Sequence, residues 1–229
     1  MTDDTRAADE SSRPAAVLWD MDGTLVDTEP YWLIAETELV HAWGGTWTEA
    51  DGLTLVGSSL DRSARVLQSR GVQLTPDEII GVLTERVVEQ LGTAIPWRPG
   101  ARELLTEVHK AGIRTALVTM SQREMADYIA THAGFPAFEV VVSGDDVEHG
   151  KPDPEAYLRA ASLLGVNAED CVAIEDSEFG VAAAVASGAT TIAAPLMLPL
   201  PESPVYTLWN TLEGKTVEDL LTLHAAVAR

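Results

Sequence analysis

The sequence predicts an α/β fold in which a parallel sheet carries helices on both faces and an all-helical segment is inserted into it. From residue 101 onward, short apolar runs alternate with helical patterns and are joined by short turns. Residues 30–97 show helical patterns only. Residues 15–19 form an apolar run that indicates a buried first strand, and an acidic turn follows it. With 229 residues, 46% of them apolar, the chain is long enough for one large domain or for a domain with an insert.

After the first strand, apolar residues at helical spacing predict a helix over 29–43, which Gly44 and Gly45 end. Two more helices are expected over 60–69 and 76–91. The second of these begins with Thr75 as N-cap, Pro76 in the first position and Glu78 three residues on. Beyond residue 100 we expect helices over 101–111, 121–133, 154–164, 177–187 and 216–227, and strands over 114–119, 139–143, 171–175 and 190–194. The sequence thus divides into a core of residues 14–29 and 98–229, a helical cap of residues 30–97, and a disordered tail of residues 1–13.

Charge narrows the range of partners. The 36 acidic residues outnumber the 15 Lys and Arg residues, which gives a net charge of −21. Such a surface repels nucleic acid and anionic membranes, so neither is expected as a partner. No run is long and apolar enough to cross a bilayer, and no secretory signal is evident, so a cytoplasmic location is expected. The single cysteine, Cys171, excludes an internal disulfide and is expected to be buried.

Two carboxylates, Asp20 and Asp22, stand at the end of the first strand, before Gly23 allows a sharp turn. Ligands bind at this edge of an open α/β sheet. Asp20 is suited to attack phosphorus, and Asp22 is suited to protonate a leaving oxygen and later to take a proton from water. An Asp-x-Asp-Gly motif also occurs in calcium loops, but Leu25 and Val26 do not supply the further ligands that such a loop needs.

Three later motifs carry matching chemistry. Thr119 ends a predicted strand and Ser121 begins the next predicted helix, where an anion binds well, although a threonine there can also be a simple N-cap. Lys151 is one of only three lysines and precedes a helix, so it is a candidate for binding phosphate rather than a solvated side chain. Glu175 and Asp176 end another buried strand. They are better explained as ligands of a divalent cation, Mg²⁺ above all, than as helix caps.

Together these motifs resemble the haloacid dehalogenase superfamily, and within it the subgroup of β-phosphoglucomutase and small-molecule phosphatases. The family signature runs Asp-x-Asp-Gly-Thr, then Ser or Thr at a strand end, then Lys, then an acidic pair. All four parts occur here in that order, and the likeness spans residues 15–194. The resemblance implies a Rossmann-like, doubly wound core with a helical cap inserted after the first motif.

The resemblance also implies roles for individual residues. Asp20 would form an aspartyl-phosphate, and Asp22 would act as acid and base with its backbone carbonyl on Mg²⁺. The transferring phosphoryl group would be bound by Gly23, Thr119, the amide of Met120 and Lys151, of which Thr119 and Lys151 would also be catalytic. Mg²⁺ would be the cofactor, with Asp20, Asp22, Glu175 and Asp176 as its expected ligands. A small phosphorylated metabolite would be the partner, and a monomer is expected, with a dimer left open.

Several features of the sequence favour hydrolysis over the other reactions of the superfamily. Asp22 argues against halide displacement, and the absence of lysine from residues 29–98 argues against a Schiff-base phosphonatase. Trp32 stands where the mutase carries a histidine, and Leu60 stands where its cap-loop arginine would fall. We therefore expect a Mg²⁺-dependent phosphatase of a small sugar or polyol phosphate, with a phosphosugar mutase as the alternative. A phosphorylation-responsive signalling domain fits less well, because such domains carry no inserted cap.

A few residues of the cap and its entry are also expected to face the substrate, although the sequence patterns that predict them are weaker than the four core motifs. Glu29 precedes the first cap helix, where it either faces substrate or simply favours the helix N-terminus. Trp32 is the tryptophan expected to face the cleft. Gly57 and Ser58 belong to the loop that corresponds to the mutase's substrate loop, and they complete the predicted binding residues.

Overall fold

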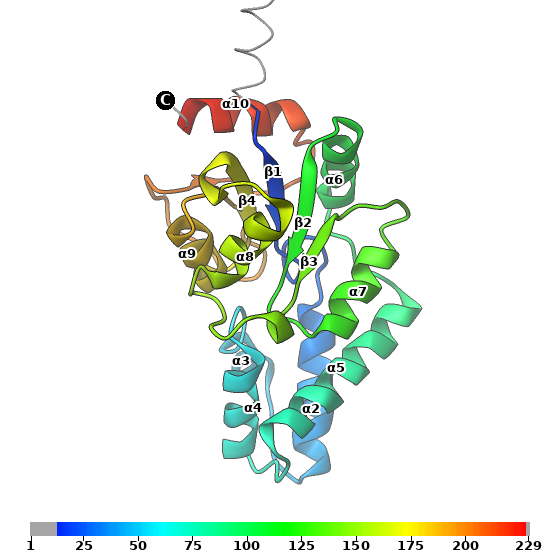
Figure 1. The fold of residues 1–229 in the computed structure, drawn as a ribbon. Helices are drawn as coiled ribbons and strands as arrows, with labels where there is room; N and C mark the ends of the chain where they lie inside the picture. The colour runs from blue at the N-terminus through cyan, green and yellow to red at the C-terminus, as the bar shows by residue number, and fades with distance from the viewer. Residues whose placement is uncertain (1–12, 228–229) are drawn as a thin grey trace, which may run out of the picture.

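The structure is a computed structural model, and it describes residues 13–227. Six parallel strands form one sheet in the order β3-β2-β1-β4-β5-β6 (Figure 1). The strands are β1 (Ala16–Trp19), β2 (Arg114–Val118), β3 (Val140–Val142), β4 (Cys171–Glu175), β5 (Thr190–Ala193) and β6 (Thr207–Leu208). The chain winds outward from β1 to β3 on one side and from β4 to β6 on the other, so the order reverses between β1 and β4. The predicted doubly wound α/β fold is confirmed.

Helices cover both faces of the sheet (Figure 1). One face packs apolar side chains such as Val17 and Trp19 against α6 (Ala101–Lys110), α7 (Arg123–Thr131) and α10 (Val217–Val227). The other packs Leu18 and its neighbours against α8 (Glu155–Leu164) and α9 (Glu178–Ala186). Because both faces are buried, the central strands are apolar throughout rather than alternating. Cys171 lies fully buried in the second of these cores, as expected.

The segment between β1 and α6 is helical and lies beyond the carboxyl ends of the strands, at the bottom of Figure 1. It consists of α2 (Glu29–Ala42), α3 (Glu49–Leu53), α4 (Leu60–Ser69) and α5 (Pro76–Thr93). Thr75 caps α5 through the capping box that the sequence predicts, with Glu78 as the reciprocal partner. The inserted helical cap is thus present, while the predicted domain boundaries at residues 30 and 97 stay a prediction.

The two connections between the cap and the sheet run side by side. Asp27 N donates to Pro96 O at 2.8 Å, and Arg98 N donates to Leu25 O at 2.9 Å. Val26 and Trp97 form an antiparallel bridge between these segments. Both connections therefore cross into the cap at one place, just after the turn that carries Asp20.

Some elements differ from the prediction. The helix expected over 121–133 begins only at Arg123, because the Ser121 amide bonds to the Thr119 hydroxyl and Gln122 is extended. The short helix α3 and the two-residue strand β6 were not predicted, nor were the 3₁₀ turns η1 (Gly144–Asp146) and η2 (Ala168–Asp170). Of the predicted tail, residues 1–12 lie outside the described part. Arg13 donates to the backbone oxygen of Ala111.

Candidate active site

The predicted motifs converge at the carboxyl ends of three adjacent strands. Asp20 follows β1, Thr119 follows β2 and Asp176 follows β4, and β1 pairs with both of the other strands. Parallel pairing places these ends at one edge of the sheet, at the point where the strand order reverses. Lys151 comes from the loop before α8 and reaches the same edge.

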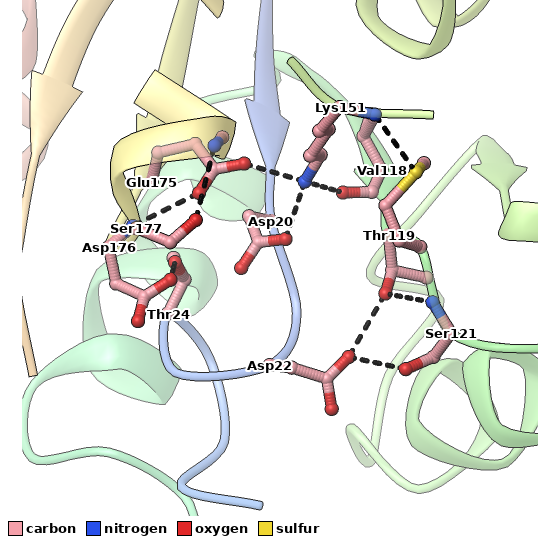
Figure 2. A network of polar contacts seen from close by, with 12 residues as sticks. Asp20, Asp22, Thr24, Val118, Thr119, Ser121, Lys151, Glu175, Asp176 and Ser177 are labelled. Atoms are coloured by element: carbon pink, nitrogen blue, oxygen red, sulfur yellow. Dashed lines mark hydrogen bonds and ion pairs between the residues drawn. The ribbon is translucent and has the colours of Figure 1, made fainter. Parts of the chain in front are cut away.

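Lys151 joins two of the acids directly (Figure 2). Its Nζ atom donates to Asp20 Oδ1 and to Glu175 Oε1, each at 2.6 Å, and to the Val118 carbonyl at 3.0 Å. All three charged side chains are buried, so the ammonium lies within a cluster of carboxylates with little exposed surface. Buried charges of one sign are costly unless they are paired, and Lys151 offsets only part of the acid charge here.

The acids strongly influence one another's protonation. Burial raises the pKa of Asp20 to about 7, with a further rise from Glu175 that Lys151 partly offsets. Burial and the charges of Asp20 and Glu175 raise the pKa of Asp176 well above its ordinary value. Burial alone would lower the pKa of Lys151, but its two carboxylate partners raise it. Lys151 alone therefore does not balance the negative charge of Asp20, Glu175 and Asp176.

The same acids fit a divalent cation. One carboxylate oxygen from each of Asp20, Glu175 and Asp176 lies within 4.8 Å of the other two. Asp20 Oδ2 is buried and accepts no hydrogen bond from the described residues. An all-oxygen donor set with one unpartnered buried carboxylate oxygen suits a hard cation such as Mg²⁺. The carboxylate of Asp22 is not part of this cluster.

Asp22 points instead toward the loop that follows β2 (Figure 2). Its Oδ2 accepts from the hydroxyls of Thr119 at 3.0 Å and Ser121 at 2.7 Å. Its Oδ1 accepts from the Thr28 hydroxyl at 2.6 Å and from Trp32 Nε1 at 3.4 Å. The two acids of the first motif are thus splayed apart, as the turn at Gly23 predicts, and groups from both the cap and the core orient Asp22.

Gly23 shapes the turn rather than the cavity. Its φ of +83° is a left-handed conformation that side chains rarely adopt, and an added Cβ would lie 2.1 Å from Asp176 Oδ2. Glycine therefore lets the first motif approach the acidic pair. Gly23 is absent from the residues that line the cavity described below, although its predicted role was in phosphate or substrate binding.

Three supporting residues were not predicted from the sequence. The Tyr157 hydroxyl on α8 donates to Glu175 Oε1 at 2.7 Å. Arg98 is buried, and its Nη1 donates to Gly23 O at 2.5 Å and to Ala194 O at 2.7 Å, which ties the turn to the end of β5. Gly180 in α9 leaves space for Glu175, because an added Cβ would lie 2.0 Å from its carboxylate. Ser177, not Asp176, caps α9 by accepting from Gly180 N.

A cavity of about 260 Å³ separates this site from the cap. This volume lies just below the usual range for small-molecule sites, about 300–1,000 Å³. The structure brings most of the predicted residues to its wall: Asp20, Asp22, Glu29, Trp32, Gly57, Ser58, Thr119, Met120, Lys151 and Asp176. Glu175 lies behind the wall, where it bonds to Lys151 and Tyr157.

The cap closes directly onto the core at Gly57. Its φ is +72°, and an added Cβ would lie 2.9 Å from Ser177 Cβ. The two cap arginines near this loop do not line the cavity. The guanidinium carbon of Arg62 lies 5.9 Å from the centre of the Phe179 ring, and Arg65 pairs with Asp61 on the surface.

Comparisons with known proteins identify the family of this chain. A family model described as haloacid dehalogenase-like hydrolase matches residues 14–188. The chain belongs to this family. It is an enzyme of the hydrolase class, and within residues 13–227 no helix is long and apolar enough to span a membrane.

Relatives within the haloacid dehalogenase-like hydrolases include named phosphatases. Hexitol phosphatase A of Escherichia coli is 34% identical over 185 residues, which cover 77% of this chain and 81% of that protein. The fructose-1-phosphate phosphatase of the same species is 33% identical over 181 residues, covering 77% of this chain and 94% of the relative. Among solved structures, CbbY of Rhodobacter sphaeroides in complex with xylulose-(1,5)-bisphosphate has a TM-score of 0.79 and 30% identity, covering 88% of this chain and 96% of that one.

Proposed function

We propose that the protein is a Mg²⁺-dependent phosphatase of a small sugar or polyol phosphate, acting through a phosphorylated Asp20. The observation that carries the proposal is the ion pair between Asp20 and Lys151 beside a three-acid cluster, at the floor of a small cavity. The hexitol and fructose-1-phosphate phosphatases named above support this choice of substrate. No second function is favoured by a specific contact.

Each side chain has a definite task in this reaction. Lys151 holds Asp20 Oδ1, which fixes the carboxylate in place, and its ammonium is positioned to offset charge on the transferring phosphoryl group. An Asp20 oxygen forms the new bond to phosphorus as the bond to the ester oxygen breaks. Asp22 gives a proton to that leaving oxygen, and the alcohol departs.

The second half of the reaction restores the enzyme. Asp22 takes a proton from water as the water oxygen attacks phosphorus, the Asp20–phosphate bond breaks and inorganic phosphate leaves. Hydrogen bonds from Thr28, Trp32, Thr119 and Ser121 hold the ionised Asp22 carboxylate over the cavity for this proton transfer. Bound among Asp20, Glu175 and Asp176, Mg²⁺ would supply positive charge for the phosphoryl oxygens.

A substitution at Asp20 tests the proposal. Asp20→Asn keeps the shape of the side chain but removes the nucleophile. We expect phosphate release from phosphorylated sugars and polyols to fall at least 1,000-fold, with an unchanged circular dichroism spectrum. Asp77→Asn, an exposed change on α5, is the matched control and keeps full activity.

The wild-type protein is assayed with Mg²⁺ and with excess EDTA, and we expect phosphate to be released only when Mg²⁺ is present. Hydrolysis that persists in Asp20→Asn, or that is unaffected by EDTA, contradicts the proposal.

A further inference from the structure

The wall of the cavity is strongly acidic. Six of its residues are Asp or Glu, namely Asp20, Asp22, Glu29, Glu36, Glu49 and Asp176. Among the described residues that line it, Lys151 is the one Lys or Arg. Lys151 lies at the phosphoryl end, where Asp20 and Glu175 already pair with it. The cap end of the cavity thus holds carboxylates and no cation.

The nearest arginines are engaged elsewhere. Arg62 lies over the Phe179 ring outside the cavity wall, and Arg98 is buried against the backbone oxygens of Gly23 and Ala194. Arg70, the cation near Trp47, pairs with Asp51 on the surface. None of them offers a guanidinium to a ligand in the cap half of the cavity.

Glu36 is the acid most firmly fixed in this region. It projects from α2, is 5% exposed, and lines the cavity. Trp47 Nε1 donates to its Oε2 at 3.0 Å, and no other described group bonds to the carboxylate. Its second oxygen is therefore left for a ligand. Ser58 also lines the cavity and has a buried hydroxyl without a partner among the described residues.

These features favour binding of an uncharged polar group over an anionic group at the cap end of the cavity. A second anionic group placed here would lose its hydration and meet a carboxylate at close range with no cation to offset it. Hydroxyls of an uncharged ligand could instead donate to the open oxygen of Glu36 or pair with the hydroxyl of Ser58. Leu33, Leu55 and Leu83 complete the wall and suit the carbon chain of a small polyol.

We propose that Glu36, held by Trp47, makes the enzyme selective for phosphomonoesters whose remaining part bears hydroxyls and no second negative charge. This inference rests on the proposed phosphatase function and narrows its substrate class. Bisphosphates and phosphorylated sugar acids are excluded, although a structural neighbour was solved with a bisphosphate.

A matched pair of substrates tests the selectivity. Glucitol 6-phosphate and 6-phosphogluconate share one carbon chain and differ at carbon 1, where the first has an alcohol and the second a carboxylate. At pH 8, we expect kcat/KM to be at least 100-fold lower for the acid, and fructose 1,6-bisphosphate to be rejected in the same way. Inhibition of p-nitrophenyl phosphate hydrolysis by each compound measures binding separately from turnover.

Variants then assign the selectivity to Glu36. Glu36→Gln keeps the acceptor for Trp47 and removes the charge, so we expect kcat/KM to rise at least tenfold for the acid and to fall two- to tenfold for the polyol. A merely structural defect would lower both. Glu38→Gln removes the same charge from the exposed face of the same helix and is expected to leave the ratio within twofold.

The outcomes separate this inference from the function on which it depends. If no phosphate ester is hydrolysed, p-nitrophenyl phosphate included, the proposed function is wrong. If p-nitrophenyl phosphate is hydrolysed but the polyol and the acid react or inhibit equally, or neither binds, only the inference is overturned. A ratio that Glu36→Gln and Glu38→Gln change equally also overturns it.

Discussion

At the scale of single residues, the position of the Glu175 carboxylate depends on three hydrogen-bond donors. Lys151 Nζ and the Tyr157 hydroxyl share its Oε1, and the Asp176 amide donates to its Oε2. Burial and Glu175 raise the pKa of Tyr157 well above its ordinary value, so its hydroxyl keeps its proton and remains a donor. Tyr157 is therefore a positioning residue that acts through Glu175.

Removing this hydroxyl tests the positioning role. Tyr157→Phe preserves packing but leaves a buried carboxylate with one donor fewer, which costs about 1–3 kcal/mol of unfolding free energy. We expect activity to fall about tenfold, and the Mg²⁺ concentration for half-maximal activity to rise.

The measurements are thermal unfolding and a Mg²⁺ titration of initial rates. Tyr31→Phe is the control, because it deletes an exposed hydroxyl that donates to Ala94 O and makes no hydrogen bond to the acids. If Tyr157→Phe loses stability but keeps the wild-type Mg²⁺ dependence, Tyr157 serves packing alone.

The buried carboxyl of Glu36 makes stability depend on pH. Burial raises its pKa to about 7, which the hydrogen bond from Trp47 only partly offsets. Its pKa in the unfolded chain is near 4.5, so the folded state holds the proton more tightly between these values. Stability is therefore lost as pH rises from about 4.5 to about 7, by an amount on the order of 3 kcal/mol.

Glu36→Gln removes the contribution of Glu36 to this dependence, while Asp20 and Glu29, whose pKa values are also raised by burial, keep theirs. We expect the variant to match the wild type near pH 4.5 and to unfold at a higher temperature at pH 8, with the difference growing between these values. Calorimetry at several pH values measures it. A difference that is constant with pH would show that the folded state does not perturb Glu36.

The site residues that the sequence predicted and those that it did not predict differ in where they lie along the chain and in what they contact. Asp20, Thr119 and Asp176 were predictable because each directly follows an apolar strand, and parallel strands end at a common edge. Tyr157 was not, because it lies among the apolar positions of α8 and its hydroxyl contact spans 18 residues. Arg98 bonds to backbone oxygens that no side-chain pattern reveals.

At the scale of elements, the first turn of α9 is fitted to the acid that precedes it. Gly180 lies so close to Glu175 that a Cβ would overlap the carboxylate. Gly180→Ala should therefore displace Glu175 or α9, with a stability loss of about 1–3 kcal/mol and at least a tenfold loss of activity. Chemical denaturation and phosphate release measure the two effects.

The matched control is another helical glycine. Gly81 in α5 has no atom within 4 Å of an added Cβ, so Gly81→Ala is expected to stabilise the protein by about 0.5–1 kcal/mol through helix propensity. Its activity should be unchanged. If Gly180→Ala behaves like Gly81→Ala, the contact with Glu175 does not constrain α9.

Element lengths explain which parts of the fold were foreseen. Helices such as α4 and α5 span several turns, so the spacing of their apolar residues was enough to predict them. The N-cap Thr75 also placed the start of α5 correctly. Helix α3 has five residues and strand β6 has two, which is too short for any period to show. Strand β6 depends on its pairing with β5, whereas α3 buries no residue and begins with a capping box of Thr48 and Asp51 that the sequence analysis did not use.

At the scale of the whole molecule, charge opposes substrate capture. A net charge of −21 repels a phosphate ester over the Debye length, which is about 30 Å at 0.01 M salt and about 8 Å at 0.15 M. We expect kcat/KM for an anionic substrate to rise several-fold when NaCl increases from 10 to 150 mM at fixed Mg²⁺. Initial rates at low substrate concentration measure this change.

Steady thermal stability over the same salt range is the control for a change in the fold. A rate that falls with salt would instead mean that local attraction by Lys151 outweighs the field of the whole surface.

The side-by-side crossing of the two linkers makes the helical insert exchangeable. Residues 28–95 leave and re-enter the sheet domain at backbone partners, since Asp27 N donates to Pro96 O. A different set of helices with adjacent ends would fit the same junction without moving any strand. One catalytic scaffold could in this way acquire new substrates by replacing a single contiguous cassette.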